Sequence, residues 1–373
     1  MNQPKRPFLD FYKEHSIIPT TLEISDKEEF FEQRNYLFES IGVSSRFLSG
    51  RKFLEFGPGT GQKADHLLSL KPKKYVAVDN NPESLKSTQI VVSNSSFAGS
   101  ASVVNADFLD YQDSEKYDFI LAELVLPTQQ NPQLLLKKLI DTLEVGGILV
   151  FTCSDSISLL SETLRRAVVK KLEFVSHDLN ASAKRIIDFF ETDLDFLVGM
   201  NRRRADWAID QMIQPMIGSL LSIPEAIEEF RNTAKFHGSS PRFVEDFRWY
   251  KSPDTKVVPL NTIAEKNYWG KCHNFLDYRQ EYLPCEEKFN RQLKNLSDNI
   301  YSLVHESEWT SESFTSVEEC CEKIKTLIST ICPETSKSIA SFIDFWVTGD
   351  QKALELFRPW WGRGTQYVSV TRS

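Results

Sequence analysis

A short stretch in which glycine alternates with other residues carries the clearest chemical signal in this sequence. Residues 51–62 read RKFLEFGPGTGQ, with glycine at positions 57, 59 and 61. Glycine lets the backbone turn sharply after a strand and, because it has no Cβ, lets a ligand approach the main chain closely. The apolar run before the glycines predicts a strand, and the amphipathic run after them predicts a helix. The stretch therefore indicates a cofactor-binding loop.

The spacing of the glycines excludes two common classes of nucleotide site. A dinucleotide fingerprint, G-x-G-x-x-G, needs its third glycine at position 62, which is Gln62. A phosphate-binding P-loop ends in Gly-Lys-Ser or Gly-Lys-Thr, and this stretch has no such ending. The loop therefore predicts a cofactor that is not a polyphosphate.

A carboxylate ends the next predicted strand. Residues 74–80 read KYVAVDN, so Asp79 follows the glycines by roughly twenty residues. At the tip of the second strand of a doubly wound sheet, a carboxylate can accept hydrogen bonds from both ribose hydroxyls. The alternative is that Asp79 only caps the turn at Asn80-Asn81-Pro82. The glycine loop upstream favours the ribose interpretation.

Two further predicted strands end in residues that suit the same ligand. Residues 102–110 read SVVNADFLD and contain Asp107 beside Phe108, and residues 117–123, YDFILAE, end in Glu123. Ligands of open α/β sheets bind outside the carboxyl ends of the strands. An acceptor beside an aromatic ring suits adenine, because one recognises the exocyclic amine and the other covers the ring face.

The motifs EFGPGTG, AVDNNP, NADF, YDFILAE and GGILVFT, in this order, resemble the class I S-adenosylmethionine-dependent methyltransferase family. The resemblance covers about residues 50–153, under half of the chain. It implies a Rossmann-like sheet and S-adenosylmethionine as the cofactor. It also implies these cofactor contacts: Glu55, Gly57, Gly59 and Gly61 around the methionine part, Asp79 on the ribose, Asp107 and Phe108 near the adenine, and Phe56, Pro58, Asn80 and Glu123 beside them.

A narrower resemblance concerns the rest of the chain. The segments FYKEHSIIP, FFEQRNYLFESIG, SSPRFVEDFRWYK, NFLDYR and WGRGTQYVSV are similar to a bacterial methyltransferase subfamily with a large helical addition. That subfamily is associated with surface glycan or secondary-metabolite chemistry, so the resemblance implies a small-molecule or glycan acceptor.

Composition narrows the range of partners. The chain has 373 residues, enough for two lobes, and a net charge of −8. Such a charge argues against a nucleic-acid acceptor. The densest basic run, Asn201-Arg202-Arg203-Arg204, is either a solvated helix face or a site for an anionic acceptor.

The six cysteines have no metal-site spacing, so we expect reduced thiols and no metal.

The start of the chain and its apolar runs bear on localisation. MNQPKRPFLD has no apolar h-region of a signal peptide, and no apolar run approaches the roughly eighteen residues of a membrane span. We therefore expect a cytoplasmic protein without a membrane span.

The alternation of strands and helices from about Phe53 to Cys153 predicts parallel βαβ units. We therefore expect a doubly wound sheet. The resemblance implies that this α/β sheet is Rossmann-like and seven-stranded, that its last strand is antiparallel, and that the helical tracts form an inserted, mostly α-helical cap. The strands after residue 153 are predicted at 242–251 and 364–372. The expected parts are a helical lid or cover (1–50), the cofactor-binding core (51–155), the first part of the cap (156–240), a returning sixth strand (241–255), the second part of the cap (256–358) and the last strand (359–373).

The N-terminal part has an amphipathic helical stripe around Phe30 to Ile41. It is either a helix that covers the sheet or, as the resemblance allows, a lid over the cofactor. In the second case Tyr12, His15 and Arg34 are candidates for lid contacts. The tryptophans beyond the fifth strand either belong to the core or line an acceptor pocket: Trp207, Trp249, Trp269, Trp346, Trp360 and Trp361.

Methyl transfer from a sulfonium is an in-line displacement, so the protein mainly positions the acceptor and excludes water. A base helps when the acceptor is a hydroxyl. The candidate bases are Glu123, after the fourth strand, and two histidines, His237 in FHGSSPRF and His273 in CHNFLDYR. Their alternative roles are an ion pair for Glu123 and structural hydrogen bonds for the histidines.

The residues after the fourth strand bear on the acceptor atom. Many nitrogen-methylating members of the family carry Asn/Asp-Pro-Pro-aromatic there, whereas this chain has AELVLP. The sequence therefore predicts methylation of a small molecule or glycan, at oxygen rather than at a nucleobase. Two rival functions remain: a non-catalytic S-adenosylmethionine-binding scaffold or sensor, and an aminopropyl transferase that uses the decarboxylated cofactor.

Overall fold

The computed structural model describes residues 7–197, 199–200, 202–215, 219–249, 251, 257–306 and 308–373. The chain forms two compact units, each built from more than one stretch of sequence. The first consists of Met1–Cys153, Met216–Tyr268 and Gln366–Ser373, and the second of Ser154–Pro215 and Trp269–Thr365. The helical unit therefore interrupts the α/β unit in sequence.

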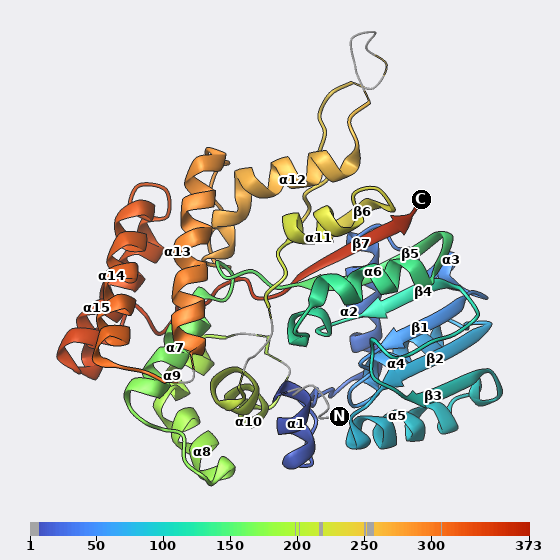
Figure 1. The fold of residues 1–373 in the computed structure, drawn as a ribbon, viewed down its shortest axis with the longest axis horizontal. Helices are drawn as coiled ribbons and strands as arrows, with labels where there is room; N and C mark the ends of the chain where they lie inside the picture. Colours follow the sequence, from blue (N-terminus) through green and yellow to red (C-terminus); the bar gives the residue numbers. More distant parts are fainter. Residues whose placement is uncertain are drawn as a thin grey trace. The chain divides into compact units, whose positions relative to one another are not determined.

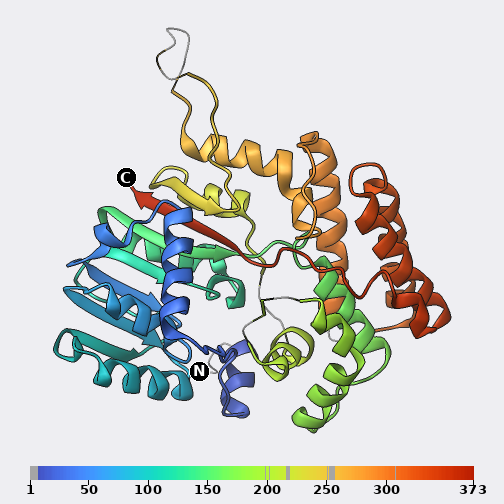
Figure 2. The same cartoon turned by 180° about the vertical axis from the view of Figure 1, so that it is seen from behind.

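The first unit contains a seven-stranded sheet, visible in Figures 1 and 2. The strand order is β3-β2-β1-β4-β5-β7-β6, with β1 to β5 parallel and β7 antiparallel to both of its neighbours. The predicted Rossmann-like sheet with an antiparallel seventh strand is thus confirmed. The strands are β1 (Lys52–Phe56), β2 (Lys74–Asp79), β3 (Ala101–Asn105), β4 (Tyr117–Ala122), β5 (Leu143–Cys153), β6 (Ala234–Ser240) and β7 (Gln366–Arg372).

Helices cover both faces of this sheet because successive strand residues point to opposite sides. On one face Phe53, Leu121 and Val150 join a buried core with residues of α2, α4 and α5. On the other face the ring of Phe151 packs 6.5 Å from that of Phe230 in α11. Figures 1 and 2 show α2 and α4 on one side and α6 and α11 on the other. The helices of this unit are α1 (Pro7–Glu14), α2 (Lys27–Ser40), α3 (Ser45–Leu48), α4 (Gln62–Ser69), α5 (Pro82–Asn94), α6 (Pro132–Thr142) and α11 (Ile223–Phe230), with 3₁₀ turns at Ala98–Ser100 and Leu126–Thr128.

The sixth strand lies earlier in the sequence than predicted. Residues 241–249 form no strand, although Phe247 and Trp249 continue the alternating pattern; these two side chains are 99% and 67% exposed. The strand is β6, AKFHGSS, which pairs with β7. A Cβ at Gly238 would lie 2.3 Å from the carbonyl oxygen of Ile41, so only glycine fits there. Tertiary pairing with β7 therefore decides the strand, and propensity does not.

The second unit consists mainly of helices. Helices α13, α14 and α15 pack against each other in sequence order, and α7 packs against α13 (Figure 1). The helices are α7 (Leu160–Lys171), α8 (Leu179–Phe189), α9 (Glu191–Asp195), α10 (Arg204–Trp207), a π-helical turn (Ala208–Ile213), α13 (Glu287–His305), α14 (Ser311–Ile328) and α15 (Pro333–Thr348), with 3₁₀ turns at Cys272–Phe275 and Gln351–Leu354. Helix α12 (Leu260–Lys271) contributes residues to both units.

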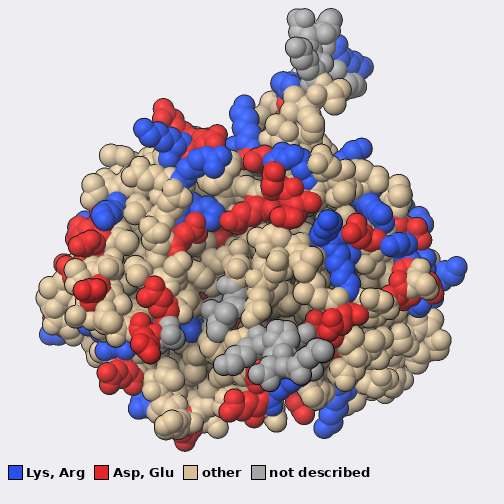
Figure 3. Space-filling model, in the orientation of Figure 1, with Lys and Arg blue, Asp and Glu red and all other residues tan. Residues whose placement is uncertain are grey.

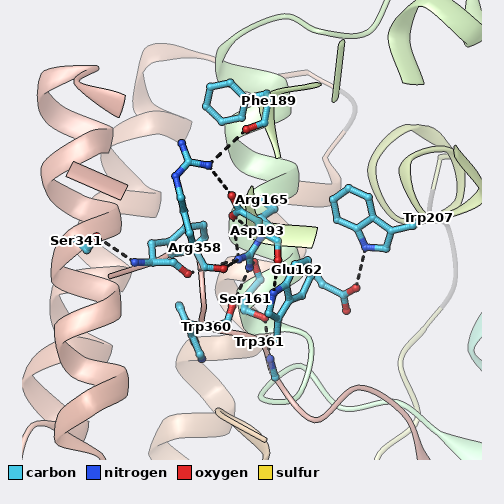
Figure 4. A network of polar contacts seen from close by, with 12 residues as sticks. Ser161, Glu162, Arg165, Phe189, Asp193, Trp207, Ser341, Arg358, Trp360 and Trp361 are labelled. Carbon is cyan, nitrogen blue, oxygen red and sulfur yellow. Dashed lines mark hydrogen bonds and ion pairs between the residues drawn. The ribbon is translucent and has the colours of Figure 1, made fainter. Parts of the chain in front are cut away.

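A buried arginine organises part of the second unit (Figure 4). The guanidinium of Arg165 pairs with Asp193 at 3.0 Å, and its Cζ lies 3.8 Å from the centre of the Trp361 ring. The rings of Trp207, Trp360 and Trp361 are buried. These three tryptophans therefore belong to a core, as do Trp269 and Trp346, whereas Trp249 is exposed. The core interpretation of the tryptophans holds for five of the six.

Charged side chains of both signs are mixed on the face seen in Figure 3. The basic run that suggested an anionic acceptor is paired with carboxylates: Arg202 with Asp210, Arg203 with Asp206 and Arg204 with Asp195. Asn201 lies outside the described residues. Within the described chain, no helix is long and apolar enough to cross a membrane, and no group of three or more His, Cys, Asp or Glu could hold a metal ion.

Candidate functional site

The carboxyl ends of four parallel strands meet at one edge of the sheet. Phe56 at the end of β1 pairs with Val78 of β2 and with Ala122 of β4, and Asp79 pairs with Asn105 of β3. The loops that follow the carboxyl ends of these strands therefore start side by side. This edge brings together most of the residues predicted for the cofactor.

The glycine loop has the backbone conformation that its glycines allow. Gly57, Gly59 and Gly61 have φ of +69°, +60° and +87°. A Cβ on Gly57 would lie 2.7 Å from Val125 Cγ2, and one on Gly61 would lie 2.9 Å from Val91 Cγ2, so these two glycines permit close packing. For Gly59 no described atom outside its chain neighbours lies within 4 Å of that position. The backbone at Gly59 thus has free space beside it where a ligand can approach.

Asp79 is buried and already hydrogen-bonded. Its Oδ1 accepts from the backbone N–H groups of Asn80 (2.7 Å) and Asn81 (2.9 Å), and its Oδ2 accepts from the Ser84 hydroxyl (2.6 Å). Burial raises the pKa of Asp79, and these hydrogen bonds offset only part of that effect. The turn-capping role therefore exists. The backbone N–H of Gly59 also contributes a hydrogen bond to this carboxylate, which has about four acceptor positions in all, so a ribose hydroxyl has to share or displace one of these donors. The ribose contact stays a prediction.

The neighbouring Asn80 leaves an acceptor atom unused. Its Oδ1 is buried and has no hydrogen-bond partner among the described residues. An unsatisfied buried amide oxygen costs free energy, and it is explained most simply by a group that binds there. The structure thus provides a free acceptor next to the predicted ribose position.

Asp107 and Phe108 follow β3 at the same edge. Asp107 Oδ1 accepts from the backbone N–H of Leu109 at 3.0 Å, which fixes the start of the loop. The half-buried ring of Phe108 packs edge-on against Phe56, with ring centres 5.5 Å apart. Phe108 Cζ also lies 3.8 Å from the Cβ position of Gly57, so this ring stands beside the glycine loop. Their adenine contact stays a prediction.

Glu55 occupies an internal position instead of the surface of the loop. Its side chain has no exposed area, and its Oε2 accepts a 2.5 Å hydrogen bond from the Tyr75 hydroxyl. Burial raises the pKa of Glu55 to about 7. Oε1 has no partner among the described residues. The Glu55 side chain is therefore not accessible for the predicted direct contact with the methionine part in this conformation, and its hydrogen-bond partner is Tyr75 of β2.

Glu123 is the centre of a buried charged cluster. Its carboxylate pairs with Arg34 of α2 (2.8 Å) and Lys63 of α4 (3.1 Å), and it accepts a 2.6 Å hydrogen bond from Tyr367 of β7. Burial alone would raise the pKa of Glu123, but these partners outweigh it and lower the pKa to about 2. A carboxylate that holds its charge so firmly is a poor proton acceptor. These contacts argue against Glu123 as a base and agree with its alternative role in an ion pair, and the identity of the base stays a prediction.

The two candidate histidines are also engaged in structural contacts. His237 lies within β6, and its Nε2 is 2.8 Å from the carbonyl oxygen of Gly42. His273 belongs to the second unit and is fully buried, with Nδ1 3.2 Å from Asn290 Oδ1 and 3.3 Å from Cys285 Sγ. Burial lowers the pKa of His273. These contacts argue against either histidine as the base and agree with their structural alternative.

The three candidates for lid contacts, Tyr12, His15 and Arg34, differ in burial and in their contacts. Arg34 faces the interior, where it pairs with Glu123, so it holds α2 to the sheet and makes no lid contact. Tyr12 is buried, whereas His15 is exposed and packs on the Phe11 ring at 4.7 Å. The helix of Arg34 therefore covers the sheet, which was the other interpretation of this part.

Sequence reasoning missed Lys63, Tyr75, Tyr367 and Leu124. The first three reach the acidic residues from α4, β2 and β7, and no sequence pattern links such distant positions. Leu124 adopts a left-handed conformation, φ +60°, directly after Glu123, and its N–H donates to Thr152 Oγ1 at 2.8 Å. Its side chain is 44% exposed. This strained leucine gives the loop after β4 an apolar, accessible position.

Comparisons with known proteins bear on the class of site. Residues 27–192 match the family model described as a methyltransferase domain. The chain has no match among curated proteins. The family match supports the class I S-adenosylmethionine-dependent methyltransferase that the motifs predicted, and it includes the glycine loop, β1 to β5 and the four strand ends described above.

Several solved structures are similar to part of the chain. N-methyltransferase NodS from Bradyrhizobium japonicum WM9, in complex with S-adenosylhomocysteine, is 20% identical over 35% of this chain and 62% of its own, with a TM-score of 0.29. PKMT2 from Rickettsia typhi, in complex with AdoHcy, is 14% identical over 64% and 50%, with a TM-score of 0.43. The CcbJ methyltransferase from Streptomyces caelestis is 18% identical over 35% and 49%, with a TM-score of 0.28. The chain thus spans less than two thirds of each of these structures.

Proposed function

We propose that this chain, which carries a class I S-adenosylmethionine-dependent methyltransferase domain, transfers the methyl group to an oxygen of a small-molecule or glycan acceptor. One observation carries the cofactor part of this proposal: the open backbone at Gly59 lies at the same strand edge as Asp79 and the unpartnered Asn80 Oδ1. S-adenosylmethionine is a nucleoside joined to an amino acid. Its amino-acid part needs backbone that no side chain covers, and its ribose hydroxyls need hydrogen-bond acceptors. This edge offers both.

The residues present fit such a cofactor. The backbone of the glycine loop would contact the methionine part, Asp79 and Asn80 would accept hydrogen bonds from the ribose, and Phe108 would cover the adenine. When bound, S-adenosylmethionine supplies a methyl group on a positively charged sulfur, which is displaced in line. The remaining work of the protein is to position the acceptor and to exclude water.

The loop after β4 supports an oxygen acceptor. It reads ELVLPT, without the Asn/Asp-Pro-Pro-aromatic pattern of many nitrogen-methylating relatives. Its exposed residue, Leu124, offers an apolar contact to the acceptor. Glu123, which is ion-paired, anchors this loop to α2 and α4 and does not remove the acceptor proton. We propose that the hydroxyl is held in line with the sulfonium and that water is excluded only from the line of attack on the methyl group. The hydroxyl proton then passes to solvent on the outer side of the acceptor as the bond forms.

The test uses purified protein, S-adenosylmethionine labelled in the methyl group, and separate pools of small hydroxylated metabolites and glycans. We expect label in an alkali-stable ether product from at least one pool. Asp79→Asn, which keeps the turn acceptor but removes the charge, should weaken S-adenosylhomocysteine binding roughly tenfold, the scale of a hydrogen bond to a charged group at about 1.5 to 3 kcal/mol. Asp178→Asn is the control, because Asp178 Oδ1 likewise accepts a backbone N–H, that of Ala181, but the residue belongs to the second unit.

Other outcomes point to the rival functions. Tight binding of the cofactor without transfer to any pool would favour a non-catalytic scaffold or sensor. Transfer of an aminopropyl group from decarboxylated S-adenosylmethionine would favour the aminopropyl transferase. Label only in amines would retain methyl transfer and overturn the oxygen assignment.

A further inference from the structure

The segment between α1 and α2 is tied to the loop that contains Asp79. The Asn81 side chain donates from Nδ2 to the carbonyl oxygen of Ile17 at 3.0 Å. Asn81 is buried, and the segment from Ile17 to Thr21 is half-buried, whereas Lys13 to Ser16 are exposed. Figure 2 shows the chain passing the ends of the parallel strands between these two helices. A short strap, residues 17–21, therefore lies beside the end of β2.

Asn81 joins three parts of the site through different atoms. Its backbone N–H donates to Asp79 Oδ1 at 2.9 Å, and its Oδ1 caps α5 by accepting from the N–H groups of Glu83 (2.9 Å) and Ser84 (3.3 Å). Its Nδ2 is left for the strap. Asn81 therefore links the Asp79 turn through its backbone, and the strap and the start of α5 through its side chain.

The local sequence of the strap limits its freedom. Ser16 takes a left-handed conformation, φ +52°, which turns the chain out of α1. Pro19, at a bend, fixes its own φ and disfavours helical backbone at Ile18. Holding such a segment costs less conformational entropy than holding a flexible one. The Asn81 hydrogen bond, one of several contacts of the half-buried strap, can thus shift how firmly the strap stays beside β2.

We propose that Asn81 is a positioning residue that couples the strap to cofactor binding: the strap is clasped when the ribose site is filled and is released more readily when it is empty. This inference rests on the proposed function, because it requires a nucleoside cofactor at Asp79. A ligand on Asp79 orders the turn to which Asn81 belongs, and the ordered turn holds Nδ2 toward Ile17. By linkage, a clasped strap then strengthens cofactor binding by the same factor.

The chain offers a matched pair of variants. Asn81 and Asn131 are both N-caps, of α5 and α6, and both are followed by a proline at the first helical position. Asn131 Oδ1 accepts from the N–H of Leu134 at 2.9 Å, and α6 covers the other face of the sheet from α2. Serine caps helices about as well as asparagine. Asn81→Ser therefore keeps the cap and removes the donor to Ile17, and Asn131→Ser makes the same change without the strap.

The experiment measures S-adenosylhomocysteine affinity by calorimetry and amide hydrogen exchange of residues 17–21 with and without this ligand. In the wild-type protein the ligand should slow exchange in the strap. Asn81→Ser should weaken binding about fivefold and remove most of this protection, whereas Asn131→Ser should match the wild type in both. Equal affinity and equal protection in Asn81→Ser and wild type would overturn the coupling while leaving the cofactor site intact. Failure of the wild type to bind the ligand would overturn the proposed function itself, and the coupling with it.

Discussion

The Arg165 network of the helical unit and the strand edge of the α/β unit differ in how completely their polar atoms are used. In the helical unit all five N–H donors of Arg165 have acceptors: Asp193 and the carbonyl oxygens of Ser161, Phe357, Arg358 and Trp360. The second oxygen of Asp193 accepts from Arg358 at 2.6 Å. In the α/β unit, Arg34 Nε, Glu55 Oε1 and Asn80 Oδ1 are buried without a partner among the described residues. Elsewhere the helical unit also has buried atoms without a partner among the described residues, such as Gln214 Oε1 and Ser297 Oγ.

A fully satisfied buried network fixes one conformation, whereas a partly satisfied one carries a cost that a binding partner can remove. Asn80 Oδ1 has no partner among the described residues and belongs to the strand edge proposed for the cofactor. The Arg165 network therefore has a structural role, and the recognition role of the strand edge stays a proposal.

The largest expected effect comes from breaking the satisfied network. Arg165→Met leaves Asp193 buried with less compensation, and removing one partner of a buried pair costs about 3 to 5 kcal/mol. Urea unfolding should show this loss, while the folded variant keeps its affinity for S-adenosylhomocysteine. Arg204→Met is the control in the same unit, because the exposed pair Arg204–Asp195 contributes less than about 1 kcal/mol. An equal loss of unfolding free energy in Arg165→Met and Arg204→Met would contradict the structural role of Arg165.

A smaller effect is expected at the strand edge, and it should appear in binding. Asparagine tolerates a left-handed backbone, so Gly59→Asn should fold, but its side chain occupies the free space beside the loop. Crowding of this kind costs about 1 to 3 kcal/mol, or roughly tenfold to a hundredfold in affinity for S-adenosylhomocysteine. Gly50→Asn is the matched control, since Gly50 also has positive φ (+74°) and nothing within 4 Å in the described structure. Unchanged affinity in Gly59→Asn would show that no ligand approaches this backbone.

The third effect concerns Glu55 and appears as a change of stability with pH. Burial raises its pKa in the folded state to about 7, above the ordinary value of the unfolded chain, so the folded protein retains a proton that the unfolded chain has lost. Its contribution to stability is therefore largest at about pH 4 and falls as the pH rises to about 7, by at most about 1.4 kcal/mol per pH unit. Urea unfolding at pH 5, 6 and 8 should show this decline in wild type and in the surface variant Glu32→Gln, and not in Glu55→Gln. Parallel curves for all three proteins would contradict the raised pKa.

Local sequence patterns predicted what depends on local structure. The apolar run before Gly57 and the carboxylate at Asp79 lie on β1 and β2, where each strand and its loop are contiguous in sequence. The strand-like run that forms β7 was also recognised from its own residues, whereas its antiparallel direction was implied by the family resemblance. In all these places the residues that form an element or loop are neighbours in the chain.

Features that depend on distant partners could not be predicted in this way. β6 contains His237, Gly238 and two serines, so propensity does not favour a strand; pairing with β7 and close packing on Ile41 create it. Because Glu123 follows β4, its sequence position made it a candidate for the general base. Its pKa is set by Arg34, Lys63 and Tyr367, which come from three other elements, so the sequence around Glu123 gave no sign of their charges.

The most direct test of the central claim is a crystal structure of the protein grown with S-adenosylhomocysteine. The account predicts the ribose hydroxyls within hydrogen-bonding distance of Asp79 and Asn80, and the amino-acid part of the ligand against the backbone of Gly59. Ligand density at another place in the molecule, or a strand edge at Gly57 to Gly61 that stays empty at saturating ligand, would contradict it.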